Sequence, residues 1–156
     1  MYLYARKYVS RFDYKTSERI TTTEFADLAD LAPADLTKYG DYSGIEIDYP
    51  VLYWRKANAI HGWFVENCAS GVDECQPIYV SREQLVELRD LCKQALSVPA
   101  MAGDILPPTS GFFFGSREID EWYMEDLKHT VNALDHILSI VPEGNWDWSF
   151  IYRASW

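Results

Sequence analysis

Four side chains between positions 54 and 61 combine the chemical types needed to hold a small planar anion. Trp54, Asn58 and His61 recur at helical intervals, and Arg55 stands beside them. An indole ring can stack on a base, a guanidinium can pair with phosphate, and amide or imidazole groups can bond ribose oxygens. This group of residues predicts a site for a nucleotide-like ligand. In the structural alternative, Trp54 packs in the core while Asn58 and His61 bond buried backbone.

The sequence SGFFFGS at positions 110–116 is a second candidate, with three phenylalanines between two glycines. On a strand, Phe112 and Phe114 point to the side opposite Phe113, so one side can be core while the other lines a pocket. Ser110 flanks the same segment. The functional interpretation makes this segment an aromatic wall opposite the helix that carries Trp54. The structural alternative is a short core strand that leads into a helix.

The helix that follows would form the floor of such a pocket, and Ser116 is placed to cap it. Trp122 and Tyr123 lie near its start, among acidic residues that suit the positive end of a helix. The same acids would repel an anion, so this helix start alone does not predict a phosphate site. The complete set of candidate ligand-binding residues is Trp54, Arg55, Asn58, His61, Ser110, Phe112, Phe114, Trp122 and Tyr123.

No pattern in the sequence indicates an enzyme, a cofactor or a metal centre. The chain has no G-x-S-x-G, P-loop or G-x-G-x-x-G sequence. The three cysteines match no zinc spacing, and we predict reduced thiols. A metal-dependent hydrolase built on the acidic residues and His129 is the weakest hypothesis, because no metal-ligand spacing supports it. We therefore predict no catalytic residues, no cofactor and no metal.

Composition narrows the partners that the protein can have. The 156 residues carry a net charge of -10 and 15% aromatic residues. Direct nucleic-acid binding is disfavoured, because Lys and Arg contacts to phosphate supply most of that affinity. An acidic, aromatic surface also suits a protein–protein inhibitor, including one that mimics DNA. No stretch approaches the ~20 apolar residues of a membrane span, so we expect an intracellular protein without membrane contact.

Periodicity and capping signals predict the main elements. Residues 1–10 and 145–156 alternate as strands, and Ile78–Val80 reads as a short strand. Three helices are expected: one from Pro50 to position 67, one that Ser81 caps with an S-x-x-Q box, and one that Ser116 caps.

These elements predict one α+β domain over residues 1–156, with a small, mostly antiparallel sheet packed against three main helices. We expect the two terminal strands to pair. Their aromatic residues also make them candidate edge strands, and self-pairing there would give a homo-oligomer.

Several motifs between positions 50 and 156 resemble, in the same order, a family of small uncharacterised proteins of tailed bacteriophages. They are YWRKANAIH with WFV, YVSREQL, LPPTSGFFFGS, DEWY and the closing SW. The resemblance implies an accessory protein in the cytoplasm of an infected bacterium, and it brings no catalytic residues. The leading hypothesis is a non-enzymatic anti-defence protein that sequesters a small nucleotide-like ligand, such as a host immune signal. The alternative is an acidic inhibitor of a host defence or replication protein.

Overall fold

The computed structural model describes residues 1–10, 12–13, 18–19, 44–109, 117–141 and 143–155. The chain divides into two compact units, one made of Met1–Arg6 with Asp48–Trp156 and the other of Lys7–Ile47. The described candidate site residues all belong to the first unit. The expectation of a single domain stays a prediction.

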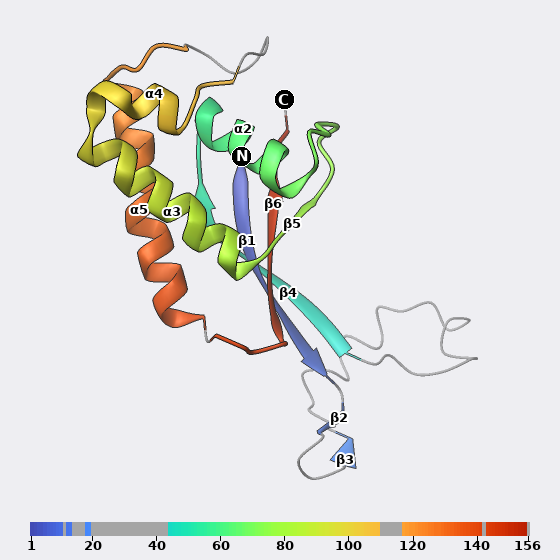
Figure 1. Cartoon of the computed structure of the whole chain (residues 1–156). Helices are drawn as coiled ribbons and strands as arrows, with labels where there is room; N and C mark the ends of the chain where they lie inside the picture. The colour runs from blue at the N-terminus through green and yellow to red at the C-terminus, as the bar shows by residue number, and fades with distance from the viewer. Residues whose placement is uncertain (11, 14–17, 20–43, 110–116, 142, 156) are drawn as a thin grey trace. The chain divides into compact units, whose positions relative to one another are not determined.

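The principal sheet has four antiparallel strands in the order β4-β1-β6-β5 (Figure 1). Its strands are β1 (Tyr2–Ser10), β4 (Gly44–Tyr53), β5 (Ile78–Val80) and β6 (Trp148–Arg153). The predicted pairing of the two terminal strands, β1 and β6, is confirmed. The expectation that they form edges is wrong, because both are central in this sheet and β4 and β5 lie at its edges. In the second unit, β2 (Phe12–Asp13) pairs antiparallel with β3 (Glu18–Arg19).

Three main helices accompany the sheet in the described part of the chain, which confirms the predicted α+β class. They are α2 (Asn58–Cys68), α3 (Arg82–Ser97) and α5 (Glu121–Ile140), with the short η2 (Pro99–Met101) and α4 (Ala102–Ile105) between the last two. Figure 1 shows α3 and α5 running side by side. No helix in the described residues is both long and apolar enough to cross a lipid bilayer.

The main core cluster includes Leu3 and Ala5 of β1 and Phe150 and Tyr152 of β6, which alternate on one face of each strand, while Ile151 of β6 is buried on the other face. Leu3 of β1 and Tyr152 of β6 are fully buried. The ring of Tyr152 stacks on Phe64 of α2, with the ring centroids 4.1 Å apart. Helices α2, α3 and α5 supply most of the remaining buried side chains.

The start of α3 forms as its sequence predicts. The Ser81 side chain accepts a hydrogen bond from the Gln84 backbone, and the Gln84 side chain accepts one from the Ser81 backbone. Val80 and Leu85, on either side of this capping box, are both buried. This signal is local, so sequence alone was sufficient to find it.

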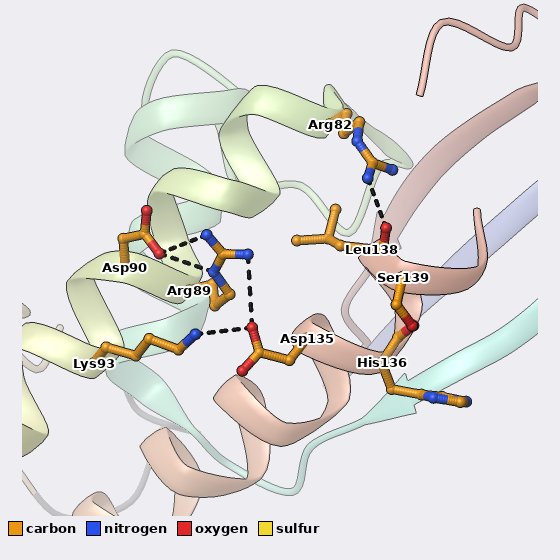
Figure 2. Close-up of polar contacts among 8 residues, drawn as sticks. All are labelled: Arg82, Arg89, Asp90, Lys93, Asp135, His136, Leu138 and Ser139. Atoms are coloured by element: carbon orange, nitrogen blue, oxygen red, sulfur yellow. Dashed lines mark hydrogen bonds and ion pairs between the residues drawn. The ribbon is translucent and has the colours of Figure 1, made fainter. Parts of the chain in front are cut away.

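Polar contacts fasten α3 to α5 along their exposed sides (Figure 2). Lys93 and Arg89 of α3 both pair with Asp135 of α5, at 2.8 Å and 3.6 Å. Nearer the end of α5, the Arg82 guanidinium donates to the Leu138 and Val141 carbonyl oxygens at 2.6 Å and 2.8 Å. Leu138 lies in the last turn of α5 and Val141 is its C-cap residue, and carbonyl groups at a helix end have no partner within the helix.

Two predicted helix starts are wrong. The helix expected from Pro50 begins at Asn58 instead, because β4 continues through Tyr53 beside β1. The helix expected after Ser116 begins at Glu121, and Asp120 is its N-cap. The phenylalanines of the SGFFFGS segment lie outside the described residues, so its predicted strand stays a prediction.

Candidate functional site

A cavity of about 300 Å³ lies between the segment that enters α2 and the beginning of α5. Four of the predicted ligand-binding residues line it: Arg55, Asn58, Trp122 and Tyr123. The other lining residues are Lys56, Ala57, Ala59, Ile60, Glu118, Asp120, Asp126 and Leu127. Two segments more than fifty positions apart in the chain are thus brought together at one concave surface.

The corner between β4 and α2 presents two cations to this cavity. Trp54 anchors the corner: it is buried, its indole nitrogen donates to Thr130 Oγ1 at 2.8 Å, and its backbone pairs with Met1. Lys56 has a φ of 62°, a left-handed conformation that non-glycine residues seldom adopt. Arg55 and Lys56 are consequently both exposed at the turn, directly before α2.

The first turn of α2 adds partial positive charge to the same side. Its N-cap, Ala57, supplies no side-chain hydrogen bond, and the turn contains no acidic residue. The backbone N–H groups at such a helix start carry the positive end of the helix dipole. The side chain of Asn58 is buried and forms part of the wall.

The α5 side of the cavity contributes two aromatic rings of different character. Tyr123 is buried, and its hydroxyl lies 2.8 Å from the Leu106 carbonyl oxygen and 3.0 Å from that of Ala102. Burial raises the pKa of Tyr123 to about 12, so its ring is a neutral wall at physiological pH. Trp122 is 79% exposed, and its indole is therefore accessible to a ligand.

Three carboxyl groups complete the α5 side. Asp120 accepts a hydrogen bond from the Tyr123 backbone N–H at 2.9 Å, which fixes the helix start. Asp126 lies further along the chain, within α5, and is half-buried. Burial is the main cause that raises the pKa of Asp126 to about 6, with His129 opposing the rise and nearby Asp120 and Glu125 adding to it. The cavity therefore has cations on one side and acids on the other.

Trp54 and His61, two of the predicted residues, do not line this cavity. Both are 1% exposed and belong to the interior, as the structural alternative held for Trp54. Both ring nitrogens of His61 lie within hydrogen-bond distance of side chains. Its Nδ1 lies 2.7 Å from the Tyr152 hydroxyl, and its Nε2 lies 3.2 Å from an Asp73 carboxylate oxygen. The predicted stripe is broken because Trp54 precedes the helix that carries Asn58 and His61.

The remaining predicted residues, Ser110, Phe112 and Phe114, lie outside the described residues. Their pairing with α2 stays a prediction. Gly62 of α2 has no side chain, which leaves its backbone open to close approach. Thr109 takes that place in the structure, because a Cβ added at Gly62 would lie 2.9 Å from the Thr109 Cβ.

The set of candidate residues predicted from the sequence did not include Lys56 or the acids of the cavity. Lys56 directly follows Arg55, and a pair of adjacent cations is a signal that sequence could have used. Nothing in the sequence indicates that Asp126 faces those cations, since the two segments meet only in the folded chain.

Metal and thiol chemistry find little support in the described residues. No group of three or more His, Cys, Asp or Glu side chains there could hold a metal ion. All three cysteines are free, as predicted. Burial raises the pKa of Cys68 to about 11 and that of Cys92 to about 12, so both stay protonated and weakly nucleophilic at neutral pH.

Comparison of the chain with known protein families, with curated proteins and with solved structures found no match.

Proposed function

We propose that the chain is a non-enzymatic binding protein that holds a small nucleotide-like ligand in the cavity between α2 and α5. The observation that carries this proposal is the convergence of Arg55, Asn58, Trp122 and Tyr123, four of the nine candidate residues, on that cavity. An open indole, a cation pair and a helix N-terminus together supply stacking and anion recognition.

Each part of the ligand has a matching group. Trp122 offers an exposed ring face for a base, and base–aromatic stacking of this kind contributes about 1–3 kcal/mol. Arg55 and Lys56 suit a phosphate, with support from the uncapped start of α2.

The size of the cavity narrows the ligand. A volume of about 300 Å³ is at the lower end of the range of small-molecule pockets. One nucleotide unit fits this volume better than a cyclic trinucleotide does. Together with the phage resemblance, this favours sequestration of a small host immune signal, or of one nucleotide unit of a larger signal, as the biological role.

Thermal shift and isothermal titration calorimetry test the proposal directly. We expect at least one member of a panel of nucleoside monophosphates, cyclic dinucleotides and ADP-ribose to raise the melting temperature, because a ligand that binds only the folded state stabilises it. The signal should be weakened in Arg55→Ala and Trp122→Ala. Lys93→Ala and Trp146→Ala are matched controls, since they remove an exposed cation and a 69% exposed indole elsewhere.

If no compound in the panel shifts the melting temperature or gives a binding isotherm, the cavity is not a nucleotide site. Equal losses in the cavity variants and in the matched controls would also count against it.

A protein–protein inhibitor is the second candidate, and the outer surface of α5 favours it. Trp122, Glu121 and Glu125 are all exposed near the start of α5, and an aromatic ring with acidic groups suits a basic partner surface. Pull-down from a bacterial lysate should then recover a specific protein. Its binding should weaken steeply with salt and should be lost in Trp122→Ala.

A further inference from the structure

The two sides of the α2–α5 cavity carry opposite charges, and this division constrains the ligand more than the cavity volume does. Arg55 and Lys56 line one side, while Glu118, Asp120 and Asp126 line the other. An anion that filled the whole cavity would meet repulsion at the acids. A ligand that is anionic at one end and rich in N–H donors at the other would be matched at both ends.

The three acids do not have equal freedom to bind a ligand. The Asp120 carboxylate already accepts the Tyr123 N–H as the helix cap. Glu118 is exposed and has interactions of its own. Asp126 is half-buried, so its charged carboxylate has lost part of its hydration. N–H donors from a ligand would offset the free-energy cost of that lost hydration.

The geometry of a carboxylate selects among the bases. Its two oxygens can accept two parallel N–H bonds, and such bidentate contacts discriminate strongly between bases. Guanine presents two adjacent donors on one edge, the ring N1–H and the exocyclic N2 amine. Adenine has one amine beside an acceptor nitrogen, and hypoxanthine has a single ring N–H.

We propose that the cavity is selective for a guanine nucleotide, with the base read by the Asp126 carboxylate and the phosphate held by Arg55 and Lys56. This inference rests on the proposed function and names the ligand class of that same site. Trp122 contributes stacking affinity without discriminating between purines, because every base has a ring face.

Calorimetry with three probes tests the selectivity. Guanosine and inosine 5′-monophosphates differ only by the 2-amino group, so their affinity ratio isolates one N–H donor. We expect the guanosine form to bind about tenfold more tightly, or better, in the usual range for a bidentate contact. Adenosine 5′-monophosphate should bind less tightly than the guanosine form.

Variants assign the preference to one side chain. Asp126→Asn should bring the guanosine-to-inosine affinity ratio close to one while phosphate-dependent binding persists. Asp135→Asn, which removes an exposed carboxylate of the same helix, should keep the preference. Arg55→Ala should weaken all three probes alike.

A change of pH supplies a second readout of the same group. The groups acting on Asp126 are Asp120, Glu125 and His129 of its own region, and Arg55 and Lys56 line the facing side. Near pH 5 protonation of Asp126 removes one acceptor, so the guanosine-to-inosine ratio should fall. Both probes carry the same phosphate, whose own titration cancels in the ratio. Asp126→Asn should show no such fall.

The outcomes separate the two proposals. If the three nucleotides bind with equal affinity, or if Asp126→Asn keeps the preference, the guanine assignment is overturned while the nucleotide site stands. If no nucleotide of any kind binds, both proposals fall.

Discussion

His61 is held on both sides of its imidazole ring, and this arrangement determines its tautomer. A carboxylate can only accept, so the Nε2 that faces Asp73 must carry the proton. In the neutral ring Nδ1 is then the acceptor, and the Tyr152 hydroxyl donates to it at 2.7 Å. Tyr152 and His61 are both buried while Asp73 is exposed, so this Tyr–His–Asp series is a hydrogen-bond network that runs from the interior to the surface.

Removing the hydroxyl of Tyr152 should therefore destabilise the fold. Tyr152→Phe preserves the stacked ring on Phe64 but leaves the buried Nδ1 of His61 without its donor. We expect a loss of about 1–3 kcal/mol in the free energy of unfolding, measured by urea denaturation. Tyr79→Phe is the matched control, because Tyr79 is largely exposed and should change stability little. Equal effects of the two changes would refute the network.

At the scale of elements, the end of α5 depends on a side chain from α3. Arg82 donates to the Leu138 and Val141 carbonyl oxygens, two acceptors that lack helical partners (Figure 2 shows the first contact). Arg82→Met should lower the free energy of unfolding by about 1–2 kcal/mol, because charged hydrogen bonds to partly buried carbonyls are lost. Lys93→Met loses only an exposed ion pair and should cost about 0.5 kcal/mol or less.

Helix α2 and the segment after α4 meet so closely that only glycine fits at position 62. Gly62→Ala would gain helix propensity, about 1 kcal/mol, but its Cβ would lie 2.9 Å from the Thr109 Cβ. Overpacking costs about 1–3 kcal/mol, so we expect net destabilisation of roughly 1 kcal/mol in urea denaturation. Thr109→Gly in the same background should restore the loss.

A second helical glycine provides the contrast. A Cβ added at Gly103 would meet only the Ile119 side chain, with the Cδ1 methyl nearest at 3.2 Å. A flexible terminal methyl can move, so Gly103→Ala should be neutral or slightly stabilising. A loss as large as that of Gly62→Ala would show that backbone effects, not the contact with Thr109, decide both results.

The sequence predicted the elements whose signals are local. The Ser81–Gln84 capping box and the alternation of β1 and β6 each depend on a few neighbouring residues, and each is confirmed. The predicted start of α2 at Pro50 was wrong, because proline is also a favoured residue at the first position of a helix. What decides between strand and helix there is the pairing of β4 with β1, a contact between distant residues.

The candidate site could likewise be predicted only as far as local residue chemistry allowed. Arg55 and Trp122 were nominated from residue type, and both line the cavity. Trp54 and His61 have equally suitable chemistry, but the fold buries them. The facing position of Asp126 depends on the packing of α5, which no local pattern records. Residue chemistry thus indicated candidate groups, while tertiary packing selected among them.

At the scale of the whole molecule, two groups on different elements oppose each other in the response to acid. Burial lowers the folded-state pKa of His61 below 6.5, so its contribution to stability is complete above pH 6.5 and is lost as the pH falls towards the folded value. The contribution of Asp126 to stability changes with pH in the opposite direction. Its pKa rises from 3.8 to about 6 on folding, so its contribution is present at low pH and is lost as the pH rises through about 6.

Between about pH 7 and pH 5 these two contributions should partly cancel in the wild-type chain. Asp126→Asn removes one of them, so the free energy of unfolding should fall more steeply on acidification than in the wild type. His61→Gln should give the opposite trend. The pKa of the Met1 amine is lowered from 8.0 by burial, and the pKa values of Asp48 and Glu83 are lowered by their hydrogen bonds. All three groups are present in the wild type and in both variants, so their effects cancel when the slopes are compared. Urea denaturation across this pH range measures the slopes, and parallel slopes in wild type and Asp126→Asn would mean that Asp126 is fully solvated in the folded protein.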